Sequence, residues 1–209
     1  EELVIPELFE NSSFALPGLS INAFNKLFHN NEIFVSMFQP IGDRVRWEGN
    51  VKKYKLNDGT VTDLGLGEAI DKNNAPVLDP NATIGGQINP VVADFWSNAS
   101  EDDGGKITKG GAGNQVPAPA SRNIYTYYNG AMVKFNEASP NPSAVGISAT
   151  ADYTAEEIFN WILGYDVLDE DRDNDTTDLR PWRFGDPLHG SPRAITYGTD
   201  DVKVFVATN

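Results

Sequence analysis

The stretch RVRWEGNVKKYKL at residues 44–56, taken with IFVSMF at residues 33–38, decides the fold class. The shorter stretch is rich in β-branched and aromatic residues, which favour strands. In the longer one, Val51, Tyr54 and Leu56 are interrupted by lysines, a rough alternation that is typical of a strand with one buried face. The two stretches therefore predict β-strands.

Two turn signals predict β-hairpins. Asn-Asp-Gly-Thr at residues 57–60 follows the longer stretch, and Asp-Gly adopts positive φ at low cost, so we expect residues 61–64 to return antiparallel. Asn-Gly at residues 129–130 joins two further strand-like runs, residues 122–128 and 131–135. This is the strongest hairpin signal in the chain.

One helix is clear from the sequence, near residues 154–163. Thr154 and Glu157 fit a capping box, in which each side chain pairs with a free backbone N–H at the helix start. The apolar side chains that follow fall on one face, and Gly164 suits the end of the helix. That apolar face consists of Ile158, Phe159, Ile162 and Leu163.

The rest of the chain predicts loops and short strands. Residues 65–122 are rich in Gly, Pro, Asn and Asp, and the glycine pairs at 104–105 and 110–111 lack the spacing of a phosphate-binding loop, so we expect flexible loops there. Residues 182–197 and 202–207 favour two more strands. The sequence thus predicts a mainly β fold of antiparallel strands with long loops and one α-helix.

The composition excludes several classes of protein. Hydrophobic residues make up 40% of the 209 residues, so the chain can bury a core. The formal net charge of −14 argues against nucleic acid and against anionic membrane surfaces as partners. No cysteine is present, which excludes disulfides and thiolate metal sites, and no apolar run approaches the roughly 18–20 residues that span a bilayer.

The sharpest chemical feature is an acidic stretch at residues 166–178. Alternating aspartates on a looping backbone can turn inward around one ion, and Ca²⁺ prefers oxygen ligands with tolerant geometry. The stretch is not an EF-hand, because Asn174 and Arg180 stand where Gly and Glu are required. A solvated acidic loop is the alternative. The candidate Ca²⁺ ligands are Asp169, Asp171, Asp173 and Asp175, with Asp178 next.

No catalytic constellation is evident, and we expect a non-catalytic protein. The two histidines, His29 and His189, are far apart in the chain. His189 lies near Ser191 and Asp186, but no nucleophile-elbow pattern surrounds them. A histidine that bonds the backbone of a turn explains His189 better.

Three segments in order resemble one family. Residues 47–56 (WEGNVKKYKL), 122–127 (RNIYTY) and 182–192 (WRFGDPLHGSP) look like segments of the PilY/PilC family of type IV pilus assembly and tip-associated adhesin proteins. The acidic stretch precedes the last segment, as in the family. One departure is Gly190, which replaces the serine that usually follows the histidine.

The resemblance implies an exported Gram-negative surface protein at the pilus tip or outer membrane, supporting pilus assembly, adhesion and twitching motility. Minor pilins or the tip complex are the implied partners, and a host or surface ligand is a further one. The first residue is Glu1, and no signal segment is seen, so we expect a middle fragment. Residues 1–150 would be a β-rich pre-propeller region, 151–180 the helix and acidic loop, and 181–209 the start of a β-propeller.

The Ca²⁺ expectation rests on the chemistry of the acidic loop alone, because the calcium loop of the family lies further along its propeller. Two other functions remain open from the sequence. One is a carbohydrate-binding or glycoside-cleaving extracellular β module, which Trp and Tyr side chains lining an open groove would favour. The other is an acidic structural spacer.

Overall fold

The computed structural model describes residues 13–14, 18–22, 31–41, 46–82, 87–98, 102–135, 141–188, 190–198 and 201–209. His29 and His189 lie outside these ranges. The chain divides into two compact units. Unit 1 comprises residues 1–115 and 184–209, and unit 2 comprises residues 116–183. The division at residues 150 and 180 that the sequence suggests stays a prediction.

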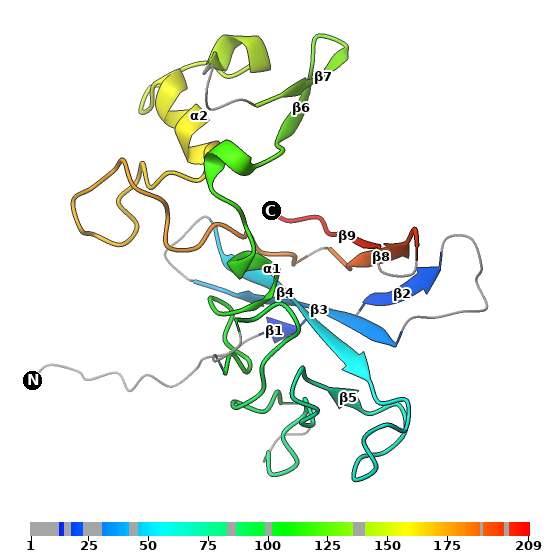
Figure 1. The fold of residues 1–209 in the computed structure, drawn as a ribbon. Helices are drawn as coiled ribbons and strands as arrows, with labels where there is room; N and C mark the ends of the chain where they lie inside the picture. The colour runs from blue at the N-terminus through cyan, green and yellow to red at the C-terminus, as the bar shows by residue number, and fades with distance from the viewer. Residues whose placement is uncertain are drawn as a thin grey trace, which may run out of the picture. The chain divides into compact units, whose positions relative to one another are not determined.

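The described strands of unit 1 form one sheet in the order β5-β4-β3-β2-β8-β9, with β1 also paired to β3 (Figure 1). All neighbours are antiparallel except β2 and β8, which are parallel. The strands are β1 Ser13–Phe14, β2 Gly18–Asn22, β3 Glu32–Gln39, β4 Glu48–Leu56, β5 Ala69–Ile70, β8 Arg193–Thr196 and β9 Val202–Phe205.

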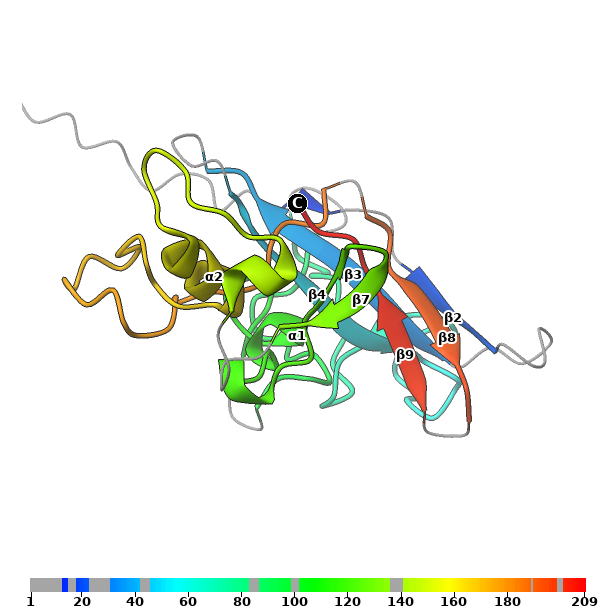
Figure 2. The same cartoon turned by 90° about the horizontal axis from the view of Figure 1, so that it is seen from above.

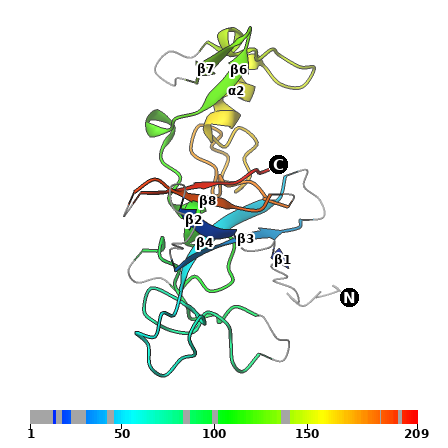
Figure 3. The same ribbon diagram turned by 90° about the vertical axis from the view of Figure 1, so that its right-hand side faces the viewer.

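The two strands predicted from the opening stretches are confirmed as β3 and β4. They pair antiparallel along their whole length, from Glu32 opposite Lys55 to Gln39 opposite Glu48. This pair is the longest ladder among the described residues, and Figure 3 shows the irregular segment between β5 and α1 (Gly111–Asn114) on one side of it.

β4 is buried on both faces at Val51 and Lys52, so the prediction of one buried face is wrong there. On one face Val51 belongs to an apolar cluster with Phe34 of β3. On the other face Tyr54 packs against Val92 of the irregular segment. Because both faces are covered, the side chain of Lys52 is 0% exposed. A lysine in the alternating pattern thus lies in the core instead of in water.

Residues 61–64 do not form the predicted return strand, and β5 pairs with the end of β4 instead. The cause is the side chain of Asn57, which is almost fully buried. Its amide donates to the carbonyls of Val61 at 2.9 Å, Leu64 at 3.0 Å and Gly65 at 3.1 Å. These bonds hold a compact loop, so strand pairing resumes only after it.

The C-terminal strands are shorter than predicted, but both exist. Of residues 182–197 only β8 is a strand, and β9 covers most of residues 202–207. Figure 2 shows β2, β8 and β9 side by side. β9 pairs with β8, and Ala194 of β8 packs with Phe34, so the last strand has neighbours within this chain.

Unit 2 contains a hairpin and the one helix longer than a single turn among the described residues. The hairpin of β6 (Tyr125–Tyr128) and β7 (Ala131–Lys134) is confirmed, with positive φ at both turn residues, as the Asn-Gly signal requires. The predicted helix is confirmed as α2 (Ala155–Leu163). Two 3₁₀ turns, η1 (Pro119–Ser121) and η2 (Pro142–Val145), complete the unit.

The core of unit 2 lies between α2, η2 and the chain leaving β7. Phe159 and Leu163 of α2 pack with Phe135 and Val145, and the rings of Phe135 and Phe159 stack at 5.4 Å. The fold is therefore mainly antiparallel β, as predicted. None of the helices in the described ranges is both long and apolar enough to cross a bilayer.

Candidate metal centre

The acidic loop, residues 166–178, is closed at its base by backbone pairing. Thr154 and Glu157 form the complete capping box at the start of α2, and Gly164, with φ of 111°, ends the helix. The N–H of Asp166 then donates to the carbonyl of Asp178 at 2.9 Å. The two ends of the loop, both within unit 2, therefore lie side by side.

Asp166 forms the floor of the loop and supports its backbone. Its side chain is fully buried. The carboxylate accepts from the N–H of Glu170 at 2.9 and 2.8 Å and from the N–H of Asp171 at 3.4 Å. The carboxylate of Asp166 thus pairs with the backbone of the loop itself.

Three of the five predicted ligands converge. Asp169, Asp171 and Asp173 each place a carboxylate oxygen within 4.8 Å of the other two. Asp169 is half-buried and the other two are exposed. The backbone reaches this arrangement through positive φ at Asp169, Arg172 and Asn174, a conformation that Asn and Asp adopt more easily than most residues.

Backbone N–H groups orient the three carboxylates. Asn174 N donates to Asp169 Oδ1 at 3.1 Å, Asp173 N donates to Asp171 Oδ1 at 3.3 Å, and Asp175 N donates to Asp173 Oδ1 at 2.7 Å. A carboxylate has about four lone-pair sites, so each one keeps capacity for a further partner.

Asp178 and Asp175, the two other predicted ligands, differ from each other. Asp178 Oδ1 is buried and has no hydrogen-bond partner in the described part of the chain. Desolvation, followed by repulsion from the acidic residues of the loop, raises the pKa of Asp178. Asp175 accepts from Thr177 N at 2.8 Å and Thr177 Oγ1 at 2.6 Å, which lowers its pKa, and it is not part of the convergent group.

The oxygen-only donor set of the acidic loop suits a hard divalent cation. Ca²⁺ takes six to eight oxygens in a flexible geometry, which carboxylates, carbonyls and water can supply together. Asp169, Asp171 and Asp173 offer three carboxylates, and a cation among them would also relieve the repulsion that acts on Asp178. Nitrogen and sulfur ligands, which Zn²⁺ usually takes, are absent from the convergent group.

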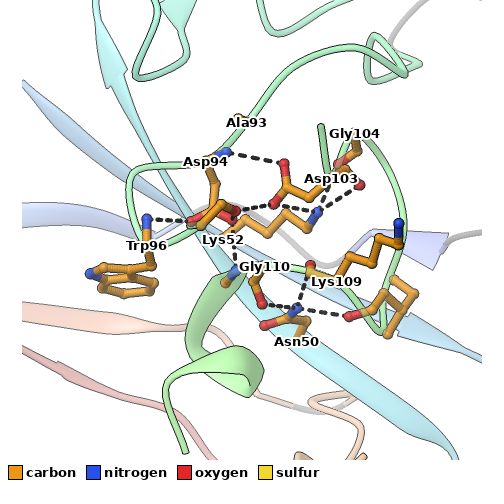
Figure 4. A network of polar contacts seen from close by, with 12 residues as sticks. Asn50, Lys52, Ala93, Asp94, Trp96, Asp103, Gly104, Lys109 and Gly110 are labelled. Atoms are coloured by element: carbon orange, nitrogen blue, oxygen red, sulfur yellow. Dashed lines mark hydrogen bonds and ion pairs between the residues drawn. The ribbon is translucent and has the colours of Figure 1, made fainter. Parts of the chain in front are cut away.

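A second polar group, in unit 1, was not predicted. We call it the Lys52 cluster; it consists of Asn50, Lys52, Asp94, Ser97 and Asp103 (Figure 4). Asn50 and Lys52 lie on the same face of β4, since they are two residues apart in a strand. The two aspartates come from the irregular segment, and both are fully buried.

Lys52 has three acceptors around its amine. Nζ lies 3.0 Å from Asp103 Oδ2, and it donates to the carbonyls of Asp103 at 3.1 Å and Gly104 at 2.8 Å. Burial lowers the pKa of Lys52, and the attraction of Asp103 opposes this shift. The amine is therefore held in a fixed position without contact with bulk water.

The two carboxylates of the cluster share one hydroxyl. Ser97 Oγ lies 2.6 Å from Asp94 Oδ2 and 2.6 Å from Asp103 Oδ2. A hydroxyl has one proton, so it can donate to only one of them. Burial, followed by the hydrogen bond with Asp103, raises the pKa of Asp94 to about 6. Protonated Asp94 donating to Ser97 satisfies all three groups.

Asp103 titrates in the opposite direction. Burial alone would raise its pKa, but the hydrogen bond from Asp94 and the charge of Lys52 outweigh burial and lower it. The cluster thus pairs one carboxylate that keeps its charge with one that favours its acid form.

The glycines at 104 and 110–111 close over the Lys52 cluster, so the prediction that they form only flexible loops is wrong. Gly110 has φ of 60°, and a Cβ there would overlap the carboxylate oxygen of Asp103 and the hydroxyl of Ser97. Asn50 fixes the same turn, because its amide donates to the carbonyls of Ile107 at 2.7 Å and Gly110 at 3.1 Å.

Comparison with protein-family models, with curated proteins and with solved structures finds no match to this chain. The likeness of residues 47–56, 122–127 and 182–192 to the PilY/PilC family therefore stays a prediction from the sequence. The two candidate sites stand on their own geometry: the three convergent carboxylates of the acidic loop and the buried Lys52 cluster.

Proposed function

We propose that this chain is a non-catalytic module of an exported, Gram-negative surface protein of the type IV pilus system, and that its acidic loop binds Ca²⁺. The observation that carries the calcium part is the convergence of Asp169, Asp171 and Asp173. Asp171 and Asp173 also repel the carboxylate of Asp178, whose Oδ1 has no hydrogen-bond partner among the described residues. A cation neutralises charges that otherwise repel, so it stabilises the closed loop.

The pilus part rests on the resemblance of three ordered segments. In this proposal the chain docks minor pilins or the tip complex and supports pilus assembly, adhesion and twitching motility. We take the β8–β9 hairpin, which follows the segment at residues 182–192 and also pairs with β2, as the start of a β-propeller. Calcium makes docking conditional, because the ion orders the loop between α2 and that hairpin.

Binding to purified minor pilins tests this function. The full chain, immobilised, is expected to retain a minor pilin in calcium buffer and to release it in excess chelator. Asp171→Asn/Asp173→Asn, which removes two ligands, is expected to bind weakly in both buffers. Asp63→Asn/Asp152→Asn is the matched control, because both aspartates are exposed and lie outside the acidic loop. If the pilin is retained equally with and without chelator, and equally by both double variants, calcium-dependent docking is contradicted. If no minor pilin is retained at all, the pilus role is contradicted.

A carbohydrate-binding module is the second candidate, and one observation favours it. Tyr125 and Tyr127 alternate on β6, so they share a face of the hairpin, and they are 54% and 71% exposed. Exposed aromatic rings on one face can stack on sugar rings. Retention of the chain by insoluble polysaccharide, lost in Tyr125→Ala/Tyr127→Ala and kept in Tyr153→Ala, would favour this candidate over the first.

A further inference from the structure

The Lys52 cluster holds an amine in contact with a carboxyl group, and these are the two groups that an amide bond joins. Nζ of Lys52 lies 3.0 Å from Asp103 Oδ2, and both side chains are 0% exposed. The atom that Nζ would attack is Asp103 Cγ, which is bonded to Oδ2, and a fixed position beside it replaces much of the entropy cost of bringing the two groups together. Figure 4 shows the Lys52 amine directed at Asp103.

The hydrogen bonds of Lys52 also orient the amine for attack. Two of its three hydrogen positions point to the carbonyls of Asp103 and Gly104. The third position points to the carboxyl group of Asp103. Transfer of that proton to Asp103 works against the lowered pKa of Asp103, and it leaves the lone pair of the neutral amine in the third position, facing the carboxyl group. Burial favours the neutral amine, as the lowered pKa of Lys52 indicates.

A proton path to the leaving oxygen is present as well. Asp94 Oδ2, Ser97 Oγ and Asp103 Oδ2 form a chain with two steps of 2.6 Å each. Asp94 keeps its proton more readily than an ordinary aspartate, because it is buried. It can pass that proton through Ser97 to Asp103 Oδ2 as the oxygen leaves.

We propose that Lys52 and Asp103 of unit 1 join in an intramolecular isopeptide bond, with Asp94 and Ser97 as the proton relay. The bond from Lys52 Nζ to Asp103 Cγ forms, and the bond from Cγ to Oδ2 breaks. Oδ2 leaves as water with two protons from the lysine ammonium, the second by exchange through Asp94, which ends in its starting form. The reaction is a dehydration, so it needs no oxidant and no co-reactant.

This crosslink would tie β4 to the irregular segment 51 residues later. β4 and the segment around Asp103 would then stay covalently linked when unit 1 unfolds. The proposal is independent of the acidic loop and of any pilus role, because all four residues lie in unit 1.

Intact mass spectrometry of the denatured full chain tests the proposal. The chain is expected to weigh one water less than its sequence requires, and a protease digest is expected to yield one branched peptide that joins Lys52 to Asp103. Lys52→Arg keeps the charge but cannot form this bond, so it is expected to have its full mass. Lys53→Arg, on the opposite face of β4, is the matched control and is expected to lose one water.

Two further results bear on the mechanism and on the outcome. Asp94→Asn is expected to fold and to lose water at least about a hundredfold more slowly, as befits a general acid. A folded wild-type chain that keeps its full mass after prolonged incubation near neutral pH overturns the proposal. A water loss that persists in Lys52→Arg, or that maps to another residue pair, overturns it equally.

Discussion

Lys52 and Asp103 are 51 residues apart in the chain, yet the amine of one lies 3.0 Å from the carboxylate of the other and neither side chain reaches solvent. The pair connects strand β4 to the segment that leads into α1. Removal of either partner leaves a buried charge without compensation, and this sets the largest expected effects on stability.

Lys52→Met is expected to lower the free energy of unfolding by about 3–5 kcal/mol, because Asp103 keeps a buried and unpaired charge. Loss of a crosslink would add to this figure. Urea denaturation followed by fluorescence measures it. Lys53→Met is the control: Lys53 pairs with Glu32 at 2.6 Å, and both side chains are partly exposed, so water screens this pair more than the fully buried one and the loss should be smaller. Equal losses in the two variants would show that Lys52 is not a buried partner.

Stability is expected to fall as the pH rises from about 4 to about 6. The pKa of Asp94 is raised from 3.8 to about 6 in the folded chain, so between these values the folded state holds a proton that the unfolded state has released. The loss is at most about 3 kcal/mol, for roughly two pKa units. Burial is the largest cause of the raised pKa of Asp94, and it acts whether or not Lys52 and Asp103 are crosslinked.

The other charged groups near Asp94 do not reverse this trend. Lys52, Asp103 and the hydroxyl of Tyr54 interact with Asp94 electrostatically. The pKa of Asp103 is lowered, so its contribution is present above pH 3.8 and is lost only at lower pH. Asp94→Asn is expected to flatten the profile between pH 4 and 6, as measured by melting temperature at each pH. An unchanged slope in Asp94→Asn would assign the effect to another group.

Gly110→Ala is expected to destabilise unit 1 more than an ordinary glycine substitution. Gly67 is the matched reference, because it also has positive φ, of 80°, but has open space around its Cβ position. Gly67→Ala should cost about 1 kcal/mol, the strain of the left-handed backbone alone. Gly110→Ala should lower the free energy of unfolding by at least about 2–3 kcal/mol, because the added Cβ overlaps the carboxylates of Asp94 and Asp103. Similar melting temperatures for the two variants would mean that the turn at Gly110 does not close over the cluster.

Asp178→Asn is expected to have opposite effects on the chain without and with calcium. Without the ion, the substitution removes a charge that Asp171, Asp173, Asp175 and Asp166 repel, so the melting temperature should rise slightly. With the ion, it removes a ligand or neighbouring charge, and calcium affinity should fall by about tenfold or more. Differential scanning calorimetry in calcium and in chelator separates the two effects. A change of the same sign in both buffers would exclude Asp178 from the calcium site.

The elements that the sequence predicts well are those with a local cause. The hairpin at residues 129–130 follows from two residues that adopt positive φ, and α2 follows from Thr154, Glu157 and Gly164 at its ends. The acidic loop is also local, so three of its five predicted ligands converge.

The Lys52 cluster escapes prediction because its causes are not local. A lysine within an alternating run usually faces water, and Lys52 lies in the core because distant residues such as Val92 and Asp103 cover this face of β4. The return strand fails for a similar reason, since the buried amide of Asn57 outweighs the turn signal. The glycines at 104 and 110 were the one sequence feature that could have indicated the cluster, because a loop whose backbone packs closely against buried groups needs glycine at the point of closest approach.

Isothermal titration of Ca²⁺ into the chelator-treated full chain, compared with Asp171→Asn/Asp173→Asn and Asp63→Asn/Asp152→Asn, tests calcium binding at the acidic loop. We expect one saturable site in the wild type and in Asp63→Asn/Asp152→Asn, and none in Asp171→Asn/Asp173→Asn. Absence of saturable binding in a folded wild-type chain, or equal binding in all three proteins, would contradict a calcium site at Asp169, Asp171 and Asp173.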